Sequence, residues 1–272
     1  WPDHLKVGLT NLFVTPLVFL NYFWLKQKTP KTDEFFGLGV NIDREPDTVV
    51  KMVNELGVDH LLIRFPLCKT DQLESYLSFV KKFQGKKIVL NLLQSRDLIE
   101  NPQEFEKALT IVFRKFAPWV EAFQVANAVN RTKWGFFSID EYLRFYQVAY
   151  QLKKKKFREI TLIGPSVIDF EFHLILRALF HLYPIRFYKT SVLLYIDRRG
   201  APEKSHLGLD LQRKIKVLAS MLALSPKAGP DILITETNWP LTGTFPYAPT
   251  SENECVSERV YTNYMVRYYL LA

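Results

Sequence analysis

From Glu34 onward, the chain alternates short apolar runs with longer amphipathic stretches. The runs are rich in Val, Ile and Leu at consecutive positions, which is typical of parallel strands buried on both faces. Seven such runs occur, at 35–42, 58–65, 86–93, 120–127, 159–166, 190–197 and 231–238. The pattern therefore predicts a sheet of seven parallel strands.

The intervening segments have apolar residues three and four positions apart and predict helices, for example at 46–57 and 139–156. We expect Asp47 to cap the first helix and Gly57 to end it. Ser138 is expected to open the second, with Glu141 three residues later as in a capping box. A repeated βα unit predicts right-handed crossovers within a parallel sheet.

A closed (β/α)8 TIM barrel is the fold class that this repeat favours. No GxGxxG or Walker sequence follows the first strand, which argues against a doubly wound nucleotide-binding sheet. Seven strands are evident, and the residues after the seventh, 252–272, read mainly as a helix. The eighth unit is therefore predicted to be missing or truncated. Residues 34–272 are expected to form one barrel domain, since 272 residues can bury a single large core.

Residues 1–33 are predicted to form an apolar helical extension. Eighteen uncharged residues, 8–25, precede the basic sequence KQKTPK, although Asn11, Pro16 and Asn21 interrupt them. Their length suffices for a membrane span. Membrane contact through residues 8–25 and a helix pair covering one end of the barrel both remain open. No small-residue cleavage site follows, so a cytoplasmic or membrane-associated location is favoured over secretion.

Charge and cysteine usage narrow the possible partners. The net charge is +8, but lysines concentrate in runs such as 153–156 at the expected end of a helix, where solvent contact explains them. A nucleic-acid partner is not predicted. Cys68 and Cys255 lie far apart without a CxxC motif, and the five histidines show no HExxH. No metal or other cofactor is predicted.

Polar residues follow the predicted strands at their carboxyl ends, where the chemistry of such barrels gathers. They are Asn41, Asp43, Arg64, Asn91, Gln94, Asn127, Asn130, Asp197, Arg198, Arg199, Glu236, Asn238 and Trp239. A barrel with no ligand would have little reason to arrange so many hydrogen-bonding groups at one end. The sequence therefore predicts a binding or catalytic site there.

The strings ITETNWP (234–240) and YIDRRGAPE (195–203) make the chain resemble a clan A glycoside hydrolase barrel. The resemblance spans residues 35–272. It rests on an Arg near the end of strand two, an Asn closing strand four, an aromatic residue near the end of strand six and a Glu closing strand seven. These are Arg64, Asn127, Tyr195 and Glu236. The resemblance implies a carbohydrate substrate, a polysaccharide or glycoconjugate, and hydrolysis by paired carboxyl groups.

It also implies roles for individual residues. Glu236 would be the nucleophile, with Arg64 holding positive charge beside it. Asn127 would bond the 2-hydroxyl of the sugar, and Trp134 and Trp239 would offer flat apolar faces to the rings. The remaining candidates for substrate binding are Asn91, Tyr195 and Asn238.

Ala128 departs from the clan pattern, which has the acid/base Glu directly after the strand-four Asn. A methyl group cannot donate a proton. Asp197 is the best alternative donor, although Arg198 and Arg199 favour its ionised form. Alanine at this position also fits an engineered substitution that removes the acid in order to trap a ligand. It equally fits a barrel that has lost hydrolytic activity and now binds glycans, or one that transfers sugars whose leaving group needs no acid. The leading interpretation is a glycosidase, and the alternative is a carbohydrate-binding pseudoenzyme.

Overall fold

The computed structural model describes residues 2–26, 35–43, 45–244 and 254–272. Its strands are β1 (Gly37–Val40), β2 (His60–Pro66), β3 (Lys87–Leu93), β4 (Ala122–Val125), β5 (Leu162–Ile168), β6 (Lys189–Leu193) and β7 (Ile232–Glu236). Its helices are α1 (Pro2–Trp24), α2 (Pro46–Leu56), α3 (Leu73–Lys81), α4 (Arg96–Glu100), α5 (Pro102–Phe116), α6 (Ile139–Lys156), α7 (Phe172–Leu179), α8 (Leu211–Leu224) and α9 (Glu258–Leu271). Short 3-10 turns are η2 (Thr70–Gln72), η3 (Thr132–Trp134) and η4 (Asp197–Arg199).

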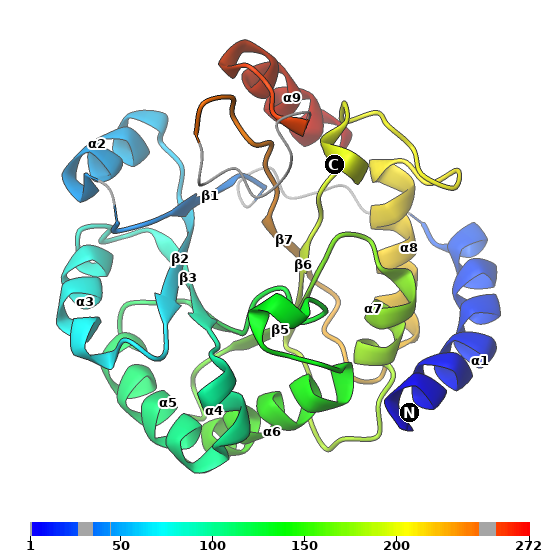
Figure 1. Ribbon diagram of the computed structural model, residues 1–272, viewed down its shortest axis with the longest axis horizontal. Coiled ribbons are helices and arrows are strands. Elements are labelled where there is room, and N and C mark those ends of the chain that lie inside the picture. The colour runs from blue at the N-terminus through cyan, green and yellow to red at the C-terminus, as the bar shows by residue number, and fades with distance from the viewer. Residues whose placement is uncertain (1, 27–34, 44, 245–253) are drawn as a thin grey trace.

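The seven strands form one parallel sheet in the order β1 to β7, curved into a nearly closed barrel inside a ring of helices (Figure 1). All seven predicted strands are confirmed, and so is the (β/α) barrel. The register pairs Arg64 with Asn91 and Asn91 with Gln124. Polar side chains of neighbouring strands therefore reach the same level at the carboxyl end of the barrel.

Helix α9 contacts both β1 and the residue that follows β6, at the place where an eighth βα unit would stand. Tyr268 donates its hydroxyl to the carbonyl of Leu194 at 2.6 Å, beyond β6. Tyr269 donates to the carbonyl of Gly37 on β1 at 3.2 Å and packs against the ring of Phe36. No eighth strand occurs in the parts of the chain that the structure describes, which agrees with the prediction.

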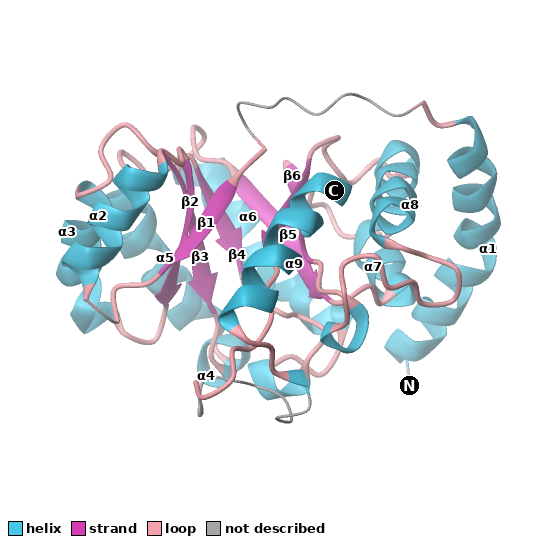
Figure 2. Cartoon of the chain, turned by 90° about the horizontal axis from the view of Figure 1, so that it is seen from above, coloured by secondary structure: helices cyan, strands magenta, loops and turns pink. Residues whose placement is uncertain are grey.

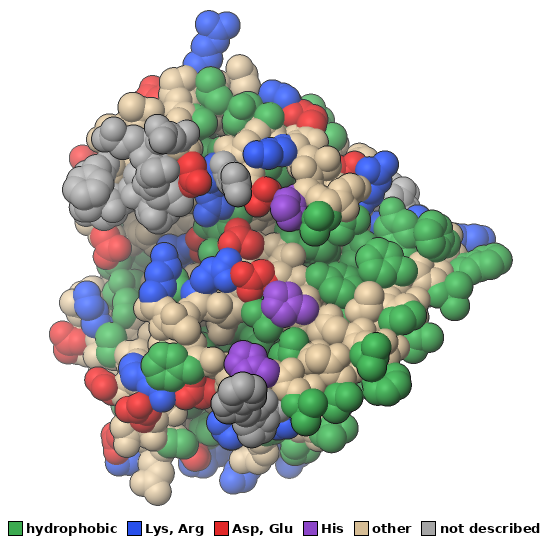
Figure 3. Space-filling model, turned by 45° about the vertical axis from the view of Figure 1, so that its right-hand side comes forward, with side chains coloured by type: hydrophobic (Ala, Val, Ile, Leu, Met, Phe, Trp, Pro, Cys, Tyr) green, Lys and Arg blue, Asp and Glu red, His purple; other side chains and the backbone are tan. Residues whose placement is uncertain are grey.

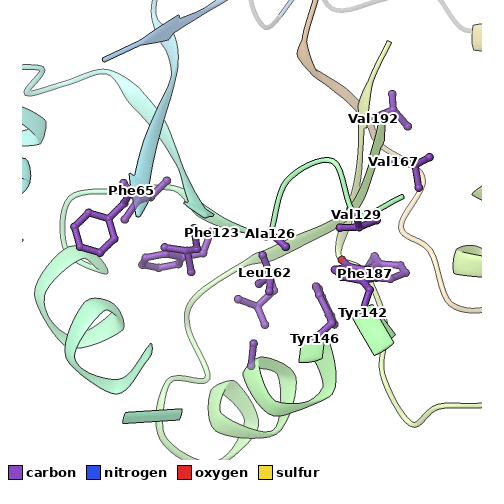
Figure 4. Close-up of a cluster of buried hydrophobic side chains, with 14 of the residues drawn as sticks. Phe65, Phe123, Ala126, Val129, Tyr142, Tyr146, Leu162, Val167, Phe187 and Val192 are labelled. Carbon is purple, nitrogen blue, oxygen red and sulfur yellow. The ribbon is translucent and has the colours of Figure 1, made fainter. Parts of the chain in front are cut away.

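Aromatic side chains fill the layer between the sheet and its helices (Figure 4). Phe187 contacts Tyr142 and Tyr146 of α6, and Phe123 of β4 meets Phe113 of α5 at 4.7 Å between ring centroids. Each of these side chains is fully buried, which stabilises the fold by about 1.5–3 kcal/mol apiece. This layer holds the strand ends in fixed positions.

The start of α2 differs from the prediction. Asp47 lies inside the first turn, where it pairs with Lys82, and the N-cap is Glu45, in a left-handed conformation without a side-chain cap. Pro46 fills the first helical position and needs no hydrogen bond from a cap. Gly57 ends the helix with a φ of 64°, as predicted.

The capping box of α6 is confirmed in part. The Ser138 hydroxyl accepts a hydrogen bond from the Glu141 amide at 3.1 Å. The Glu141 carboxylate accepts from the Phe137 amide at 2.9 Å instead of from Ser138, and it also pairs with Arg96. Glu141 thus links the start of α6 to the start of α4.

The amino-terminal extension is one 23-residue helix in its described part, not the predicted helix pair. Helix α1 runs along the outer side of α7 and α8, so it covers a flank of the barrel and not an end (Figures 1 and 2). Residues 27–33 of the predicted extension lie outside the described residues. Asp3–Trp24 is long and apolar enough to cross a membrane, with a mean hydropathy of 1.3.

Candidate active site

Glu236, the last residue of β7, receives three donors from three other strand ends. Arg64 donates to Oε2 of the carboxylate and Tyr195 donates to Oε1. The side-chain amide of Asn127 donates to Oε2 at 3.5 Å. The Glu236 side chain keeps 19% of its surface exposed, so a ligand at the mouth of the barrel can reach it.

Two neighbouring amides fix the orientation of Asn127. Its Oδ1 accepts from Nδ2 of Asn91 at 3.0 Å and from Nε2 of Gln124 at 3.3 Å. With Oδ1 occupied in this way, Nδ2 points towards Glu236. The carbonyl oxygens of the Asn91 and Gln124 side chains are buried and lack a partner within the described chain. Both side chains thus direct their NH2 groups at Asn127, and that of Gln124 also donates to the Ala126 carbonyl at 3.3 Å.

The backbone around Asn127 is held in an uncommon conformation. Ala126 and Ala128, on either side of it, have positive φ angles of 72° and 47°, a region that non-glycine residues rarely adopt. Gln94 stabilises this turn through backbone atoms. Its Oε1 accepts from the backbone N–H of Asn127 at 3.0 Å. Its Nε2 donates to the backbone carbonyls of Asn127 at 2.8 Å and Trp134 at 2.9 Å. Such strain concentrates at functional sites.

Tyr195 is a buried donor. Burial raises its pKa well above the usual range, and the Glu236 charge and hydrogen bond raise it further, outweighing the nearby Arg199 and Arg64. The Arg199 guanidinium lies 3.6 Å from the centre of the tyrosine ring. Tyr195 therefore keeps its proton and donates a hydrogen bond to Glu236.

Ala128 is fully buried, and other side chains enclose its methyl group. It packs with Leu193 and Tyr195, against Trp134 and Ile168. The position that carries the acid/base Glu in the clan pattern thus lies in an apolar contact. An acid at this position would need its neighbours to move.

Asp197 is not among the hydrogen-bond partners of Glu236 in the described chain. Asp197 begins η4, and its Oδ2 lies 3.4 Å from Nδ1 of His206. The hydrogen-bond donors to Glu236 are Arg64, Asn127 and Tyr195. The role of Asp197 as proton donor stays a prediction.

A hollow of about 310 Å³ opens between the loops that follow β3 and β4. Its lining consists of Gln94, Ser95, Arg96, Thr132, Lys133, Trp134, Gly135 and Phe137. Trp134 is half-buried here and is connected to the Asn127 turn through Gln94. An indole with a partly open surface beside a polar network suits contact with a sugar ring.

Trp239 is placed differently from the prediction. Only 2% of its surface is exposed, its rings pack edge-on against Tyr264 and Tyr268 of α9, and its Nε1 donates to the Gly200 carbonyl at 2.9 Å. The expectation of a sugar-stacking face at Trp239 was wrong, because α9 covers it. The adjacent Asn238 is exposed.

Metal ligands do not gather at this site. No group of three His, Cys, Asp or Glu side chains suited to a metal occurs among the residues that the structure describes. Cys68 and Cys255 are both free thiols.

Three neighbours of the site have contacts with Asn127 or Tyr195 that were not predicted from the sequence. Gln94 and Gln124 orient Asn127, and Arg199 covers Tyr195. The sequence did contain a hint for Gln124, because it is a polar residue within an otherwise apolar strand. A buried glutamine needs hydrogen-bonding partners, which indicates a structural or functional contact. The stacking of Arg199 on Tyr195 depends on the η4 turn, which sequence spacing does not reveal.

Comparison with known proteins places the fold. No family model and no curated protein sequence matches the chain. Among solved structures, it is similar to the GH39 enzyme from Xanthomonas axonopodis pv. citri, with a TM-score of 0.56 and 13% identity over 77% of this chain and 52% of that one. A β-glucosidase from Exiguobacterium marinum matches with a TM-score of 0.53 and 11% identity, over 78% of this chain and 80% of that one.

The Agrobacterium tumefaciens virulence factor SghA, in complex with the substrate analogue salicin, gives a TM-score of 0.52 and 11% identity, over 83% of this chain and 71% of that one. The chain spans about half the length of the GH39 enzymes among these structures. At such identities the likeness establishes the fold: an α/β barrel of the kind on which these glycosidases are built.

Proposed function

We propose that this barrel acts on a carbohydrate by glycoside hydrolase chemistry, with Glu236 as the nucleophile. The observation that carries the proposal is the convergence of Arg64, Asn127 and Tyr195 on one partly exposed carboxylate at the carboxyl end of the strands. An ionised carboxylate accepts all three bonds. The glycosidases of similar fold add support at the level of architecture.

In the proposed reaction, one Glu236 oxygen attacks the anomeric carbon and the glycosidic oxygen departs with its electron pair. Water then breaks the glycosyl-enzyme ester. Asn127 would bond the 2-hydroxyl, and Trp134, which lines the hollow beside it, would contact a sugar ring. Asn91 would act by orienting Asn127. Exposed Asn238 remains a candidate for substrate contact.

Protonation of the leaving group is the weak step, because Ala128 cannot supply it. Asp197 is the proposed donor. Glycosides with good leaving groups need little acid assistance, so they should react even where alkyl glycosides do not. The proposal therefore predicts a steep dependence of rate on leaving-group acidity.

The test offers the protein a panel of aryl β-glucosides and β-xylosides of graded leaving-group pKa. We expect turnover of the most activated members and its loss in Glu236→Gln. Asp197→Asn should slow only the substrates with poor leaving groups. Activity indifferent to Glu236→Gln would remove that residue from the role of nucleophile.

A carbohydrate-binding pseudoenzyme is the second candidate, favoured by the closed apolar contact around Ala128. Its signature is glycan binding without turnover, even of glycosyl fluorides. Under this alternative, Glu236→Gln would change affinity only. Contact of residues 8–25 with a membrane is a separate proposal, which depends on the orientation of α1 and not on the barrel mouth.

A further inference from the structure

Helix α1 is unusual for a surface helix because its outward side is apolar, while its inward side combines the apolar residues Val14, Val18 and Tyr22 with polar side chains that bond to the protein. The side chains of Asp3 and Asn11 bond to α7, at Nε of Arg177 and the carbonyl of His173, both at 3.0 Å. Asn21 donates to the Ser220 hydroxyl of α8, also at 3.0 Å. A surface helix normally places polar and charged residues on its outward side.

The outward side forms a continuous apolar stripe at spacings of three and four. Its members are Leu5, Leu9, Leu12, Phe13, Leu17, Phe19, Leu20, Phe23 and Trp24, all of them exposed. Only 6% of the apolar stretch within Asp3–Trp24 is buried. Figure 3 shows these hydrophobic side chains gathered on one projecting flank. Contiguous apolar surface of this kind marks an interaction site.

We propose that this stripe lies in the interface of an anionic phospholipid bilayer, with the helix parallel to the membrane plane. The polar bonds to α7 and α8 hold α1 lengthwise against the barrel, which favours lying in the interface over crossing it. Interfacial helices bury such an apolar face at the boundary between headgroups and acyl chains. Phe23 and Trp24 suit the headgroup level, where aromatic rings concentrate.

Charge favours an anionic surface. The chain carries a net charge of +8. Lys26 is exposed directly after the helix, and Lys216 of α8 lies 4.5 Å from the Tyr22 ring. Basic groups near a membrane surface add roughly 1 kcal/mol each with anionic lipids.

A second copy of the chain fits this face less well. A helix of this length presents roughly 34 Å by 10 Å, or about 340 Å². A stable interface needs about 800 Å² from each partner. The single stripe therefore falls short of a dimer interface, whereas a bilayer has no such minimum.

The experiment measures co-sedimentation of the 272-residue chain with vesicles of phosphatidylcholine, with and without phosphatidylglycerol. The test variant is Leu17→Gln with Leu20→Gln, whose side chains are 54% and 60% exposed. The matched control is Met52→Gln with Leu56→Gln, 54% and 63% exposed on α2 across the barrel. Circular dichroism verifies the fold of both variants.

We expect the unaltered chain and the α2 control to bind the vesicles that contain phosphatidylglycerol, and high salt to weaken that binding. The α1 variant should lose at least tenfold in bound fraction. Equal binding by both variants would overturn the proposal, as would absence of vesicle binding by the unaltered chain. A dimer abolished by the α1 variant, without lipid binding, would assign the face to a second copy. Resistance to an alkaline wash would contradict the interfacial placement.

Discussion

The Tyr195 hydroxyl donates a hydrogen bond to Oε1 of Glu236, across the ends of the two adjacent strands β6 and β7. Arg64, from β2 on the other side of the open seam between β7 and β1, donates to Oε2. The carboxylate is therefore held by a neutral donor on one oxygen and a cation on the other. Fixed donors of this kind pre-position a reacting group.

Removing the Tyr195 hydroxyl tests this arrangement. Tyr195→Phe keeps the buried ring but leaves Oε1 without its donor. We expect kcat/KM for activated glycosides to fall ten- to a hundredfold, corresponding to about 1.4–2.7 kcal/mol. Tyr142→Phe is the control, since that hydroxyl is buried without a partner in the described chain. Equal rates in the Tyr195 variant and the unaltered chain would show that the donor is dispensable.

Placing a glutamate at position 128, as in the clan A glycoside hydrolase pattern, tests whether the apolar surroundings of Ala128 can accept a carboxyl group. Ala128→Glu would push a carboxyl group into the contact with Leu193 and Tyr195. We expect a loss of about 2–4 kcal/mol in the free energy of unfolding, from overpacking and from burial of a polar group. Hydrolysis of unactivated glycosides should not appear. Strong new activity at unchanged stability would reveal an intact acid/base pocket and contradict this account.

The buried ion pairs beneath α1 provide a stability prediction. Arg177 is almost fully buried and pairs with Asp3 at 3.0 Å and Asp140 at 2.9 Å. Arg177→Met leaves two carboxylates without this partner and should cost about 3–5 kcal/mol in urea unfolding. The exposed pair of Lys107 and Glu104 is the comparison: Lys107→Met should change stability by less than about 0.5 kcal/mol. Similar small losses for both would contradict the role of Arg177.

The lowered pKa of His181 leads to a prediction of how the free energy of unfolding depends on pH. Burial lowers its pKa from 6.5 to about 4, with Lys227 and Arg177 adding to the effect. The unfolded chain therefore takes up a proton below pH 6.5 that the folded chain resists until about pH 4. The contribution of neutral His181 to the free energy of unfolding is fully present above pH 6.5. It is lost as the pH falls towards 4, by about 3 kcal/mol at most. His181→Phe should flatten this part of the curve measured by urea unfolding. An unchanged slope would exclude His181 as its source.

The strands could be predicted from sequence because each is a short apolar run, and the polar residue that closes a run marks a strand end. Once the barrel was assumed, Arg64, Asn127, Tyr195 and Glu236 had to meet at one end. Their hydrogen bonds connect residues up to 172 positions apart. Spacing places such groups in the same region but does not determine which atoms bond.

The surroundings of Trp239 and the orientation of α1 could not be predicted from local sequence patterns. Trp239 follows the family-like string and was expected to face a ligand, but α9 packs over it. For α1, the composition indicated an apolar helix without showing which face meets the barrel. That choice depends on partners such as Arg177 and Ser220, far along the chain. Both outcomes are set by tertiary packing and not by local propensity.

The central claim, that Glu236 forms a bond to the anomeric carbon, is tested most directly by trapping it. A 2-deoxy-2-fluoroglycosyl fluoride loses fluoride as the ester forms, and the electron-withdrawing fluorine slows its hydrolysis. Intact-protein and peptide mass spectrometry should find one added fluorosugar on Glu236, and none in Glu236→Gln. An adduct on another residue, or persistent absence of any adduct while glycans bind, would contradict the account.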